Sequence, residues 1–332
     1  VTYAKPIAAQ PVGKITTSIT RAYNNGAEDR GRESSLSNLI AQQMVESVNA
    51  TGNNHADIGI MNPGGVRNDL PYGTDGTISY GQAAAILPFG NTLKTADYTG
   101  AQVKRILEEQ WQPVSASRPF LALGLSKNVT YTYDPNRAQG DRISGIYLDG
   151  TPIDPAKVYS VTSSSFLVTN VGTAPDNFAT MLQGANYRDT GLSDGNAFVD
   201  WLKANSPVSP SWVQHGVGVI GTPAVTGSKN GPQTITMRLE GFDLTSLGSP
   251  ANSTASIRIN GTEVATATIT PVINTTPIPS RKGVAEISFT LTKQQLLPWT
   301  KGNGHRDVDV MISVVADPTG TVAYVPMKVS KG

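Results

Sequence analysis

The sequence contains no cysteine among its 332 residues. This absence excludes disulfide bonds, thiol nucleophiles and cysteine-ligated metal sites. Charged residues make up only 15% of the chain, and its formal net charge is +1. Such a balance gives no global electrostatic field that would hold nucleic acid or an anionic membrane surface. The partner that we expect is therefore a small molecule or another protein.

Long apolar runs are also missing. No stretch reaches the roughly 18 to 20 apolar residues that a membrane-spanning helix requires, so we expect no transmembrane segment. No signal-peptide pattern opens the chain, which would be true of a mature or a truncated protein. Few charges together with abundant Thr, Ser, Asn and Gly are typical of many secreted bacterial proteins. We therefore predict a secreted or cell-surface location, in the cell wall or the periplasm.

Histidine is scarce, with only His55, His215 and His305 in the chain. A two-metal phosphatase needs a dense set of His, Asp and Asn ligands that hold two ions about 4 Å apart. No Asp-x-His and no Gly-Asn-His-Asp or Gly-Asn-His-Glu run is present, and neither is a P-loop or a G-x-S-x-G elbow. We therefore expect no metal site, no cofactor and no catalytic residue in this chain. All three histidines are predicted to lie on the surface.

Glycine-bordered turns, by contrast, are prominent. The run NPGGVR at residues 62–67 follows IGIM at 58–61, which predicts a short buried strand. The glycines then fall where a strand ends and where the backbone can approach a ligand closely. A second segment, LPFGN at 87–91, follows about twenty residues later. Together these segments place an arginine, a carboxamide and an aromatic ring on turns, as recognition of a nucleotide requires.

Four helices are predicted in the first two thirds of the chain. Apolar residues recur at near-helical spacing over 36–48, after a serine pair suited to capping. A second helix is expected from Ser79 to about Leu87. Thr99 can cap a third helix and Asp194 a fourth, and each of these carries an apolar stripe. The stripes are predicted to face the core rather than a cofactor.

Strand-like runs lie between these helices, at 127–133, 143–148 and 157–168. The second run is followed by an Asp-Gly pair at 149–150, which is a hairpin signal. This mixture of helices and strands predicts one α+β domain over residues 1–222.

The composition changes after residue 220. Gly, Ser, Thr and Pro mark a linker over 221–233, beyond which apolar and polar residues alternate with the strand period. An Asn-Gly pair at 260–261 predicts a tight hairpin. This pattern predicts a second domain over residues 223–332, an all-β immunoglobulin-like sandwich. Its candidate strands are 234–239, 255–259, 262–269, 285–291, 308–315 and 321–329.

Several motifs, in order along the chain, resemble a known family. They are the NPGGVR run, the segment SYGQAAAILPFGN at 79–91, and the Thr-Gly pair at 99–100 that opens a helix reaching 107–108. The combination resembles the C-terminal domain of the 5'-nucleotidase family, which includes ecto-5'-nucleotidase and periplasmic UDP-sugar hydrolase. It covers residues 10 to 205 approximately. The resemblance implies a four-layer α/β/β/α domain that binds substrate, with two sheets packed between helices.

Two arginines would contact the phosphate side of a ligand. Planar guanidinium groups bind phosphate oxygens in pairs and keep their charge. The resemblance assigns this role to Arg30 and Arg67, which match arginines that bind the ligand in the family. The alternative for Arg30 is a solvated loop with local ion pairs to Asp29 and Glu33. That alternative is favoured for Arg32.

Three residues would recognise the base. Asn62 offers a donor and an acceptor from one side chain, so it can read a heteroaromatic edge, although it could instead shape a turn. The resemblance matches Phe89 and Phe166 to the two phenylalanines between which the family holds the base. A stacked base is stabilised by roughly 1 to 3 kcal/mol per ring. The alternative for Phe89 is an ordinary core position.

Asp176 would accept hydrogen bonds from both ribose hydroxyls. An aspartate at this place, before Phe178 and Met181, is also an excellent helix cap, which is the alternative. Here the chain departs from the family, whose members typically show Gly-Gly-Asp-Gly-Phe closer to the phenylalanine. The loop in this chain is longer and is stiffened by Pro175.

The resemblance implies that the chain is the nucleotide recognition domain of a secreted 5'-nucleotidase-like metallophosphoesterase, a phosphoric monoester hydrolase. The divalent metal pair would belong to an N-terminal metallophosphatase domain outside this sequence. Alone, the chain would bind nucleoside or nucleotide without hydrolysing it, because positioning is present while the activated water is not. The alternatives are a 2',3'-cyclic phosphodiesterase or 3'-nucleotidase, a UDP-sugar hydrolase, and a non-enzymatic cell-surface protein on a nucleotidase-derived fold.

Overall fold

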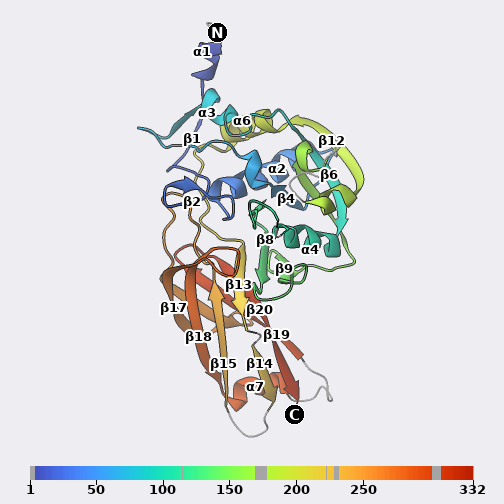
Figure 1. The fold of residues 1–332 in the computed structure, drawn as a ribbon, viewed down its shortest axis with the longest axis vertical. Helices are drawn as coiled ribbons and strands as arrows, with labels where there is room; N and C mark the ends of the chain where they lie inside the picture. The colour runs from blue at the N-terminus through green and yellow to red at the C-terminus, as the bar shows by residue number, and fades with distance from the viewer. Residues whose placement is uncertain are drawn as a thin grey trace. The chain divides into compact units, whose positions relative to one another are not determined.

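The computed structural model describes six stretches of the chain (Figure 1): 4–113, 115–168, 178–221, 223–227, 232–300 and 308–331. These stretches form two compact units that interleave along the chain. The first unit comprises 1–129, 153–211 and 244–249, and the second comprises 130–152, 212–243 and 250–332. Compactness in space is a different property from independent folding, so the predicted division at residue 222 stays a prediction.

A five-stranded mixed sheet forms the centre of the first unit, in the order β12-β6-β11-β4-β7. The pair β11 and β4 is parallel, whereas the other neighbours are antiparallel. Strand β4 coincides with the short buried strand predicted at 58–61, and all four of its residues are buried. The bounds are β4 Ile58–Met61, β6 Thr92–Thr99, β7 Gly124–Leu125, β11 Val158–Ser164 and β12 Ala185–Ser193.

Helices of the first unit begin at the polar caps that the sequence indicates. The Ser34 side chain accepts a hydrogen bond from the Ser37 N–H at 3.1 Å, and Ser79 and Thr99 each open a capping box. Helix α2 packs closely on β4 at Gly59. A Cβ added there would stand 2.1 Å from the Ala41 carbonyl oxygen, so only glycine fits this contact. The helices are α1 Ala4–Ala8, α2 Ser35–Ala50, α3 Tyr80–Ala84, α4 Gly100–Glu108, α5 Ser165–Val168 and α6 Asp194–Asn205, with 3₁₀ turns η1 Pro63–Gly65 and η3 Ala179–Gln183.

Two of the helix predictions need correction at their ends. Helix α3 ends at Ala84, before the expected Leu87, because the chain then turns so that the Ile86 carbonyl accepts from the Arg67 N–H at 3.0 Å. The cap of α6 is Ser193, and Asp194 is the first helical residue rather than the cap. Four short strands complete the first unit: β1 Pro11–Lys14 with β5 Thr77–Ser79, and β2 Tyr23–Asn24 with β3 Ala27–Glu28.

The second unit is built on one large curled sheet of eleven strands, in the order β10-β9-β8-β13-β15-β18-β17-β16-β19-β20-β14. Its bounds are β8 Val129–Tyr133, β9 Ile143–Leu148, β10 Thr151–Pro152, β13 Gly216–Ile220, β14 Ala224–Gly227, β15 Gln233–Glu240, β16 Thr254–Ile259, β17 Thr262–Asn274, β18 Arg281–Leu291, β19 Val308–Asp317 and β20 Val322–Lys331, with helix α7 Lys293–Thr300.

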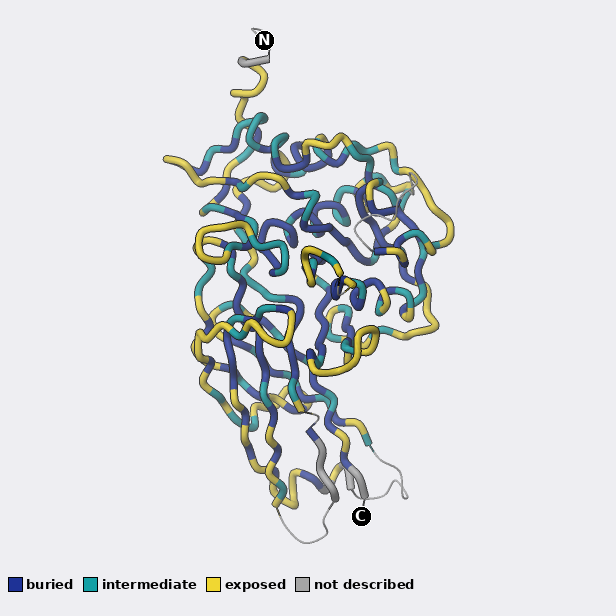
Figure 2. The backbone as a smooth tube through the Cα atoms, in the orientation of Figure 1, coloured by how far each residue is buried: buried dark blue, intermediate teal, exposed yellow. Residues whose placement is uncertain are grey.

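The curl lets the inward side chains of the second unit share one core. Burial alternates along β19, as expected for strands with one face inward (Figure 2). The six strands predicted after residue 233 are confirmed, and β14 lies within the predicted linker. The immunoglobulin-like sandwich is not confirmed, because the hydrogen-bonded order runs through β13 into β8, β9 and β10. The core includes Val217, Ile235, Leu239, Phe242, Ile257, Ile287, Ile312 and Val325.

Both predicted hairpin turns are present in the second unit. Asp149 and Gly150 have φ values of 48° and 78°, and Asn260 and Gly261 have values of 49° and 78°. Positive φ at both central residues is the type I′ geometry that suits the right-handed twist of paired strands. The first turn joins β9 to β10 and the second joins β16 to β17. Of the helices described, none is both long and apolar enough to span a membrane.

Candidate functional site

A cavity of about 280 Å³ opens in the first unit, at the edge of the five-stranded sheet. Strands β4 and β11 run parallel, so Asn62 after β4 and Ser164 at the end of β11 reach the same edge. Strand β6 runs antiparallel to β11, so the residues just before Thr92 arrive at that edge as well. The lining residues are Arg30, Asn62, Gly64, Gly65, Arg67, Phe89, Asn91, Ser164 and Phe166.

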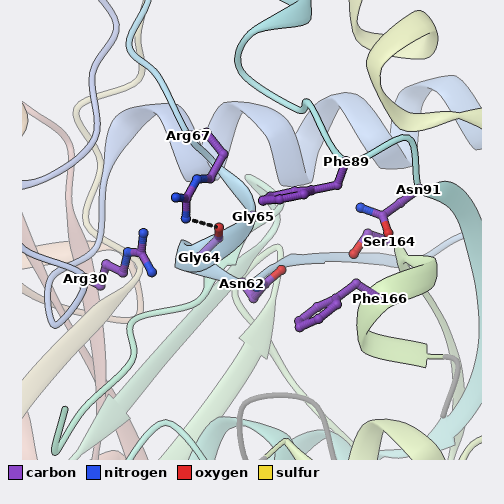
Figure 3. A pocket seen from close by; sticks show the side chains of 9 residues that line it. All are labelled: Arg30, Asn62, Gly64, Gly65, Arg67, Phe89, Asn91, Ser164 and Phe166. Carbon is purple, nitrogen blue, oxygen red and sulfur yellow. Dashed lines mark hydrogen bonds between the residues drawn. The ribbon is translucent and has the colours of Figure 1, made fainter. Parts of the chain in front are cut away.

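Two phenylalanine rings stand on opposite sides of this cavity (Figure 3). Phe89 is 60% exposed and Phe166 is 44% exposed, although both are large apolar residues. The alternative of a core position for Phe89 is therefore wrong. Apolar surface left in water is unfavourable, and a flat ring placed between the two would remove part of both faces from water.

The carboxamide of Asn62 lies at the wall of the cavity, near Gly64, Gly65 and Phe166 (Figure 3). Asn62 is only 2% exposed, and its Oδ1 accepts no hydrogen bond in the described part of the chain. The side chain also makes no capping bond to η1, contrary to the turn-forming alternative. A buried acceptor without a donor costs about 1 to 3 kcal/mol. A ligand that donates a hydrogen bond here would remove that cost.

Gly65 lies closely packed beside this carboxamide. A Cβ at position 65 would lie 2.3 Å from the Met61 Cε and 3.0 Å from the Asn62 Oδ1. A side chain at this position would therefore push the flexible end of Met61 aside and crowd the buried amide oxygen. The predicted close approach of this backbone to a ligand stays a prediction.

Arg67 extends from the loop that follows η1. Its backbone N–H donates to the Ile86 carbonyl at 3.0 Å, and its Nη1 donates to the Gly64 carbonyl at 3.3 Å. The guanidinium carbon also lies 5.6 Å from the centre of the Phe89 ring, which is cation–π distance. The loop, the arginine and the ring are therefore fixed together at one end of the cavity.

Arg30 supplies a second guanidinium on the same side of the cavity as Arg67 (Figure 3). Its Nε donates to Glu28 Oε1 at 2.9 Å, so its partner is Glu28 rather than Asp29 or Glu33, the two residues named in the alternative for Arg30. Among the nine lining residues there is no carboxylate, which makes the cavity suited to an anion. Arg32 does not line the cavity and pairs with Asp29 at 3.1 Å, and burial lowers the pKa of Arg32 despite that pair.

Asn91 and Ser164 line the cavity without having been assigned a role from the sequence. Asn91 connects three segments: its Oδ1 accepts from the Ser165 Oγ at 3.3 Å, and its Nδ2 donates to Asp194 Oδ2 at 3.3 Å. Burial raises the pKa of Asp194, although hydrogen bonds from Gly195 and Asn91 oppose the rise. The available signal was their place in the motifs, since Asn91 ends LPFGN and Ser164 precedes Phe166 by two residues.

Asp176, the predicted ribose ligand, lies outside the described residues, which stop at 168 and resume at 178. The other five predicted site residues all line the one cavity. They come from four separate segments of the chain, which the folding of the first unit brings together. Their role in binding stays a prediction.

The donor set of the described residues does not fit a metal centre. No group of three or more His, Asp or Glu residues within them is placed to hold an ion. His55 is exposed and lies 2.9 Å from Asp57, as expected for a surface residue. His215 is only 2% exposed, so that prediction is wrong; it directly precedes the buried strand β13. His305 falls outside the described residues.

Comparison with known proteins gives one family match. The model described as "5'-nucleotidase, C-terminal domain" matches residues 11–183. Endonuclease YhcR of Bacillus subtilis (strain 168) is 30% identical over 203 residues, which is 61% of this chain and 15% of that protein. The trifunctional nucleotide phosphoesterase protein YfkN of the same organism is 30% identical over 190 residues, 54% of this chain and 12% of that protein.

The solved structure of a 5'-nucleotidase precursor from Thermus thermophilus is also similar. The TM-score is 0.52 at 27% identity, and the match covers 65% of this chain and 41% of that one. The chain therefore spans less than half the length of each of these three proteins.

Proposed function

The chain belongs to the family of 5'-nucleotidase C-terminal domains, and from this premise we propose that it is the nucleotide recognition domain of a nucleoside phosphate hydrolase. The mixed α/β fold and the sequence similarity to nucleotidases support the family-level statement. The recognition role rests on the cavity in the first unit.

One observation carries this proposal. A single cavity has two exposed phenylalanine rings on opposite sides, an unsatisfied buried amide oxygen between its glycine wall and Phe166, and two guanidinium groups toward one end (Figure 3). A nucleotide has the complementary parts: a flat heteroaromatic base with donors on its edge, and an anionic phosphate joined to it. Stacking surface, an edge acceptor and an anion site in one cavity therefore favour a nucleotide over a purely apolar or a purely anionic ligand.

Each side chain then has a defined role. Phe89 and Phe166 would enclose the base, with roughly 1 to 3 kcal/mol from stacking on each ring. The Asn62 Oδ1 would accept from a donor on the edge of the base. Arg30 and Arg67 would bind the phosphate oxygens, where a paired contact is strong because both partners are charged. Asp176 would accept from the ribose hydroxyls.

The chain by itself would bind without hydrolysing. Attack on a phosphate ester requires an activated water, and the described residues offer no set of ligands for the divalent metal pair that would supply it. We place that pair in a metallophosphatase domain outside this sequence. We also place the whole protein outside the cytoplasm, at the cell surface or secreted.

The position of the phosphate on the ribose is left open by this cavity. Stacking rings and guanidinium groups do not read which ribose oxygen is esterified, since a guanidinium binds any phosphate that it reaches. The similar proteins are named as an endonuclease, a trifunctional nucleotide phosphoesterase and a 5'-nucleotidase precursor. The same recognition domain would serve a 5'-nucleotidase, a 3'-nucleotidase or a cyclic phosphodiesterase.

Calorimetric titration of the chain with AMP and with adenosine tests the proposal. We expect both to bind, and Phe89→Ala to weaken each by about 1 to 3 kcal/mol. Tyr72→Ala is the matched control, because Tyr72 is another partly exposed aromatic residue that does not line the cavity. Absence of binding by the intact chain, or equal loss in the two variants, would contradict the proposed role.

A further inference from the structure

A chain of alternating ion pairs runs beside the cavity and begins at Arg30. Glu28 accepts from the Arg30 Nε with Oε1 and from the Arg21 Nη1 with Oε2, both at 2.9 Å. Arg21 in turn contacts Asp69, with its Nε 3.1 Å and its backbone nitrogen 2.8 Å from Oδ1. We call Arg30, Glu28, Arg21 and Asp69 the ion-pair chain. One carboxylate, Glu28, is thus shared between two arginines.

The far end of the ion-pair chain lies beside the second cavity arginine. Asp69 stands two residues after Arg67, in the same loop. The Tyr23 hydroxyl also donates to Asp69, and Tyr23 pairs with Glu28 across the β2–β3 hairpin. The hairpin therefore connects the segment that carries Arg30 to the loop that carries Arg67.

The side chains of the ion-pair chain are partly buried. Their exposed fractions are 18% for Arg21, 21% for Arg30, 21% for Asp69 and 28% for Glu28. Partly buried pairs are screened less than exposed ones, and networks hold their geometry better than isolated surface pairs. Burial by itself would raise the pKa of Asp69, but the hydrogen bonds from Arg21 and Tyr23 lower it overall, so the carboxylate stays ionised.

The guanidinium of Arg30 is hydrogen-bonded to Glu28 along its Nε edge, and its Nη edge points elsewhere. A guanidinium carries five N–H donors in a rigid fork. Glu28 takes the Nε donor, and within the described residues no acceptor contacts the Nη atoms. Fixing Nε fixes the rotation of the whole planar group, which sets the direction of the remaining donors.

We propose that Glu28 is a positioning residue, which orients the Arg30 guanidinium so that its Nη edge meets the ligand phosphate. This inference rests on the proposed function and goes beyond it, because Glu28 does not line the cavity. The β2–β3 hairpin then has a role in binding, because it carries Glu28.

The positioning role and simple electrostatics predict opposite signs. Removal of a carboxylate next to Arg30 makes the surroundings of the cavity more positive, so charge alone predicts tighter binding of a phosphate. Loss of orientation predicts weaker binding, because the freed arginine must then be ordered by the ligand itself. The sign of the change therefore separates the two explanations.

The experiment is a double-mutant cycle on the whole chain, read by calorimetric titration with AMP and with adenosine. Glu28→Ala is expected to weaken AMP binding by about 3- to 10-fold and to leave adenosine binding unchanged. In the Arg30→Ala background, Glu28→Ala is expected to have no further effect. Asp75→Asn is the control, because Asp75 also pairs with a cation, Lys14 at 3.3 Å, but is well exposed and does not line the cavity.

A second variant keeps the test decisive if Glu28→Ala folds poorly. Glu28→Gln retains one acceptor oxygen, which can serve one of the two arginines, so a smaller loss of the same sign is expected. Unchanged or tighter AMP binding by these variants would overturn the inference. So would a loss that persists in the Arg30→Ala background, because Glu28 would then act on something other than Arg30.

The outcomes also separate this inference from the proposed function. If the intact chain binds neither AMP nor adenosine, the proposed function fails. If it binds both equally, the phosphate contact fails and the inference with it, while recognition of the base survives. If AMP binds more tightly than adenosine and the Glu28 variants behave like the intact chain, the inference alone is wrong.

Discussion

The two units use the same residue type in opposite ways. In the second unit, Arg281 is buried and its side-chain nitrogens all donate hydrogen bonds within the protein. Its Nε donates to Glu240 at 2.6 Å. Its Nη atoms donate to the backbone carbonyls of Thr276, Pro277 and Pro279. In the first unit, Arg67 gives one side-chain donor to the Gly64 carbonyl and otherwise faces the cavity. An arginine whose side-chain donors are all hydrogen-bonded within the protein has a structural role. An arginine with unbonded donors at a cavity is available to a ligand.

Two asparagines, one in each unit, show the same difference in hydrogen bonding at equal burial. Asn252 and Asn62 are each 2% exposed. The Asn252 amide donates to Phe242 and Asp243, and its Oδ1 accepts from the Thr319 N–H at 3.0 Å. The Asn62 Oδ1 accepts nothing within the residues described. Burial alone therefore does not distinguish a structural amide from a recognition amide, whereas the hydrogen bonds do.

The largest expected effect concerns the buried pair of the second unit. Arg281→Ala should lower the free energy of unfolding by about 3 kcal/mol, because the buried Glu240 would lose its buried arginine partner and keep the more exposed Arg238. Arg67→Ala should change it by only about 0.5 kcal/mol or less, since Arg67 lies at the cavity. Urea unfolding of both variants measures the difference. Similar losses in the two would break the distinction between internal and available arginines.

The asparagines give the next largest contrast. Asn252→Ala should cost about 1 to 3 kcal/mol of stability, because it leaves the half-buried Thr319 N–H without its acceptor and removes a donor from the buried Asp243. Asn62→Ala should leave stability unchanged or slightly higher, because it removes a costly buried oxygen that has no donor but also leaves a small cavity. It should weaken AMP binding instead. Thermal unfolding and titration of each variant would check this. A marked loss of stability in Asn62→Ala would show that its amide is structural.

The phenylalanines test the cavity more finely. Replacing Phe89 or Phe166 by Leu keeps an apolar side chain and removes the flat face, so AMP and adenosine should each bind more weakly by roughly 1 to 2 kcal/mol. Stability should hardly change, because both rings are substantially exposed. Titration beside urea unfolding measures both properties. Equal affinity in the Leu variants would mean that the rings contribute area but no stacking.

A smaller effect is the opposite pH dependence of two carboxylates in the first unit. The folded-state pKa of Asp69 lies below its ordinary value of 3.8, because hydrogen bonds to the ionised form outweigh burial. Its contribution to stability is therefore present above 3.8 and is lost as the pH falls through the folded-state pKa. The advantage of the intact chain over Asp69→Asn, about 1 kcal/mol at neutral pH, should shrink as the pH falls below 3.8.

Asp194 is the matched case of opposite sign. Burial raises its pKa, so the folded state favours the protonated form. Its contribution is present below the ordinary value of 3.8 and is lost as the pH rises through the folded-state pKa. The intact chain should thus lose stability relative to Asp194→Asn as the pH rises from about 3 to 7. Urea unfolding at several pH values measures both pairs, and parallel profiles would contradict the assignment.

Local signals in the sequence predicted local structure well. Ser34, the Thr99 capping box and the turn at Asn260 and Gly261 act within a few residues, and each is present. The joining of β13 to β15 and the pairing of β14 with β20 were not predicted, because they depend on partners far along the chain. Helix α7 was missed because Pro298 within it argues against a helix.

The difference between local and long-range signals also explains which cavity residues could be predicted. Arg30, Asn62, Arg67, Phe89 and Phe166 were predicted through motifs, and they line one cavity. The participation of Asn91 and Ser164 follows from the antiparallel register of β6 and β11, in which Leu93 faces Ser164. The burial of His215 likewise depends on the position of β13 within the large sheet. Neither register nor sheet order is encoded in a short stretch of sequence.

The most direct test of the account is a crystal structure of the chain with AMP bound. The account predicts the adenine between the Phe89 and Phe166 rings, a donor of the base within hydrogen-bond distance of the Asn62 Oδ1, and the phosphate at Arg30 and Arg67. AMP bound at another place, or a cavity that stays empty at saturating AMP, would contradict the account.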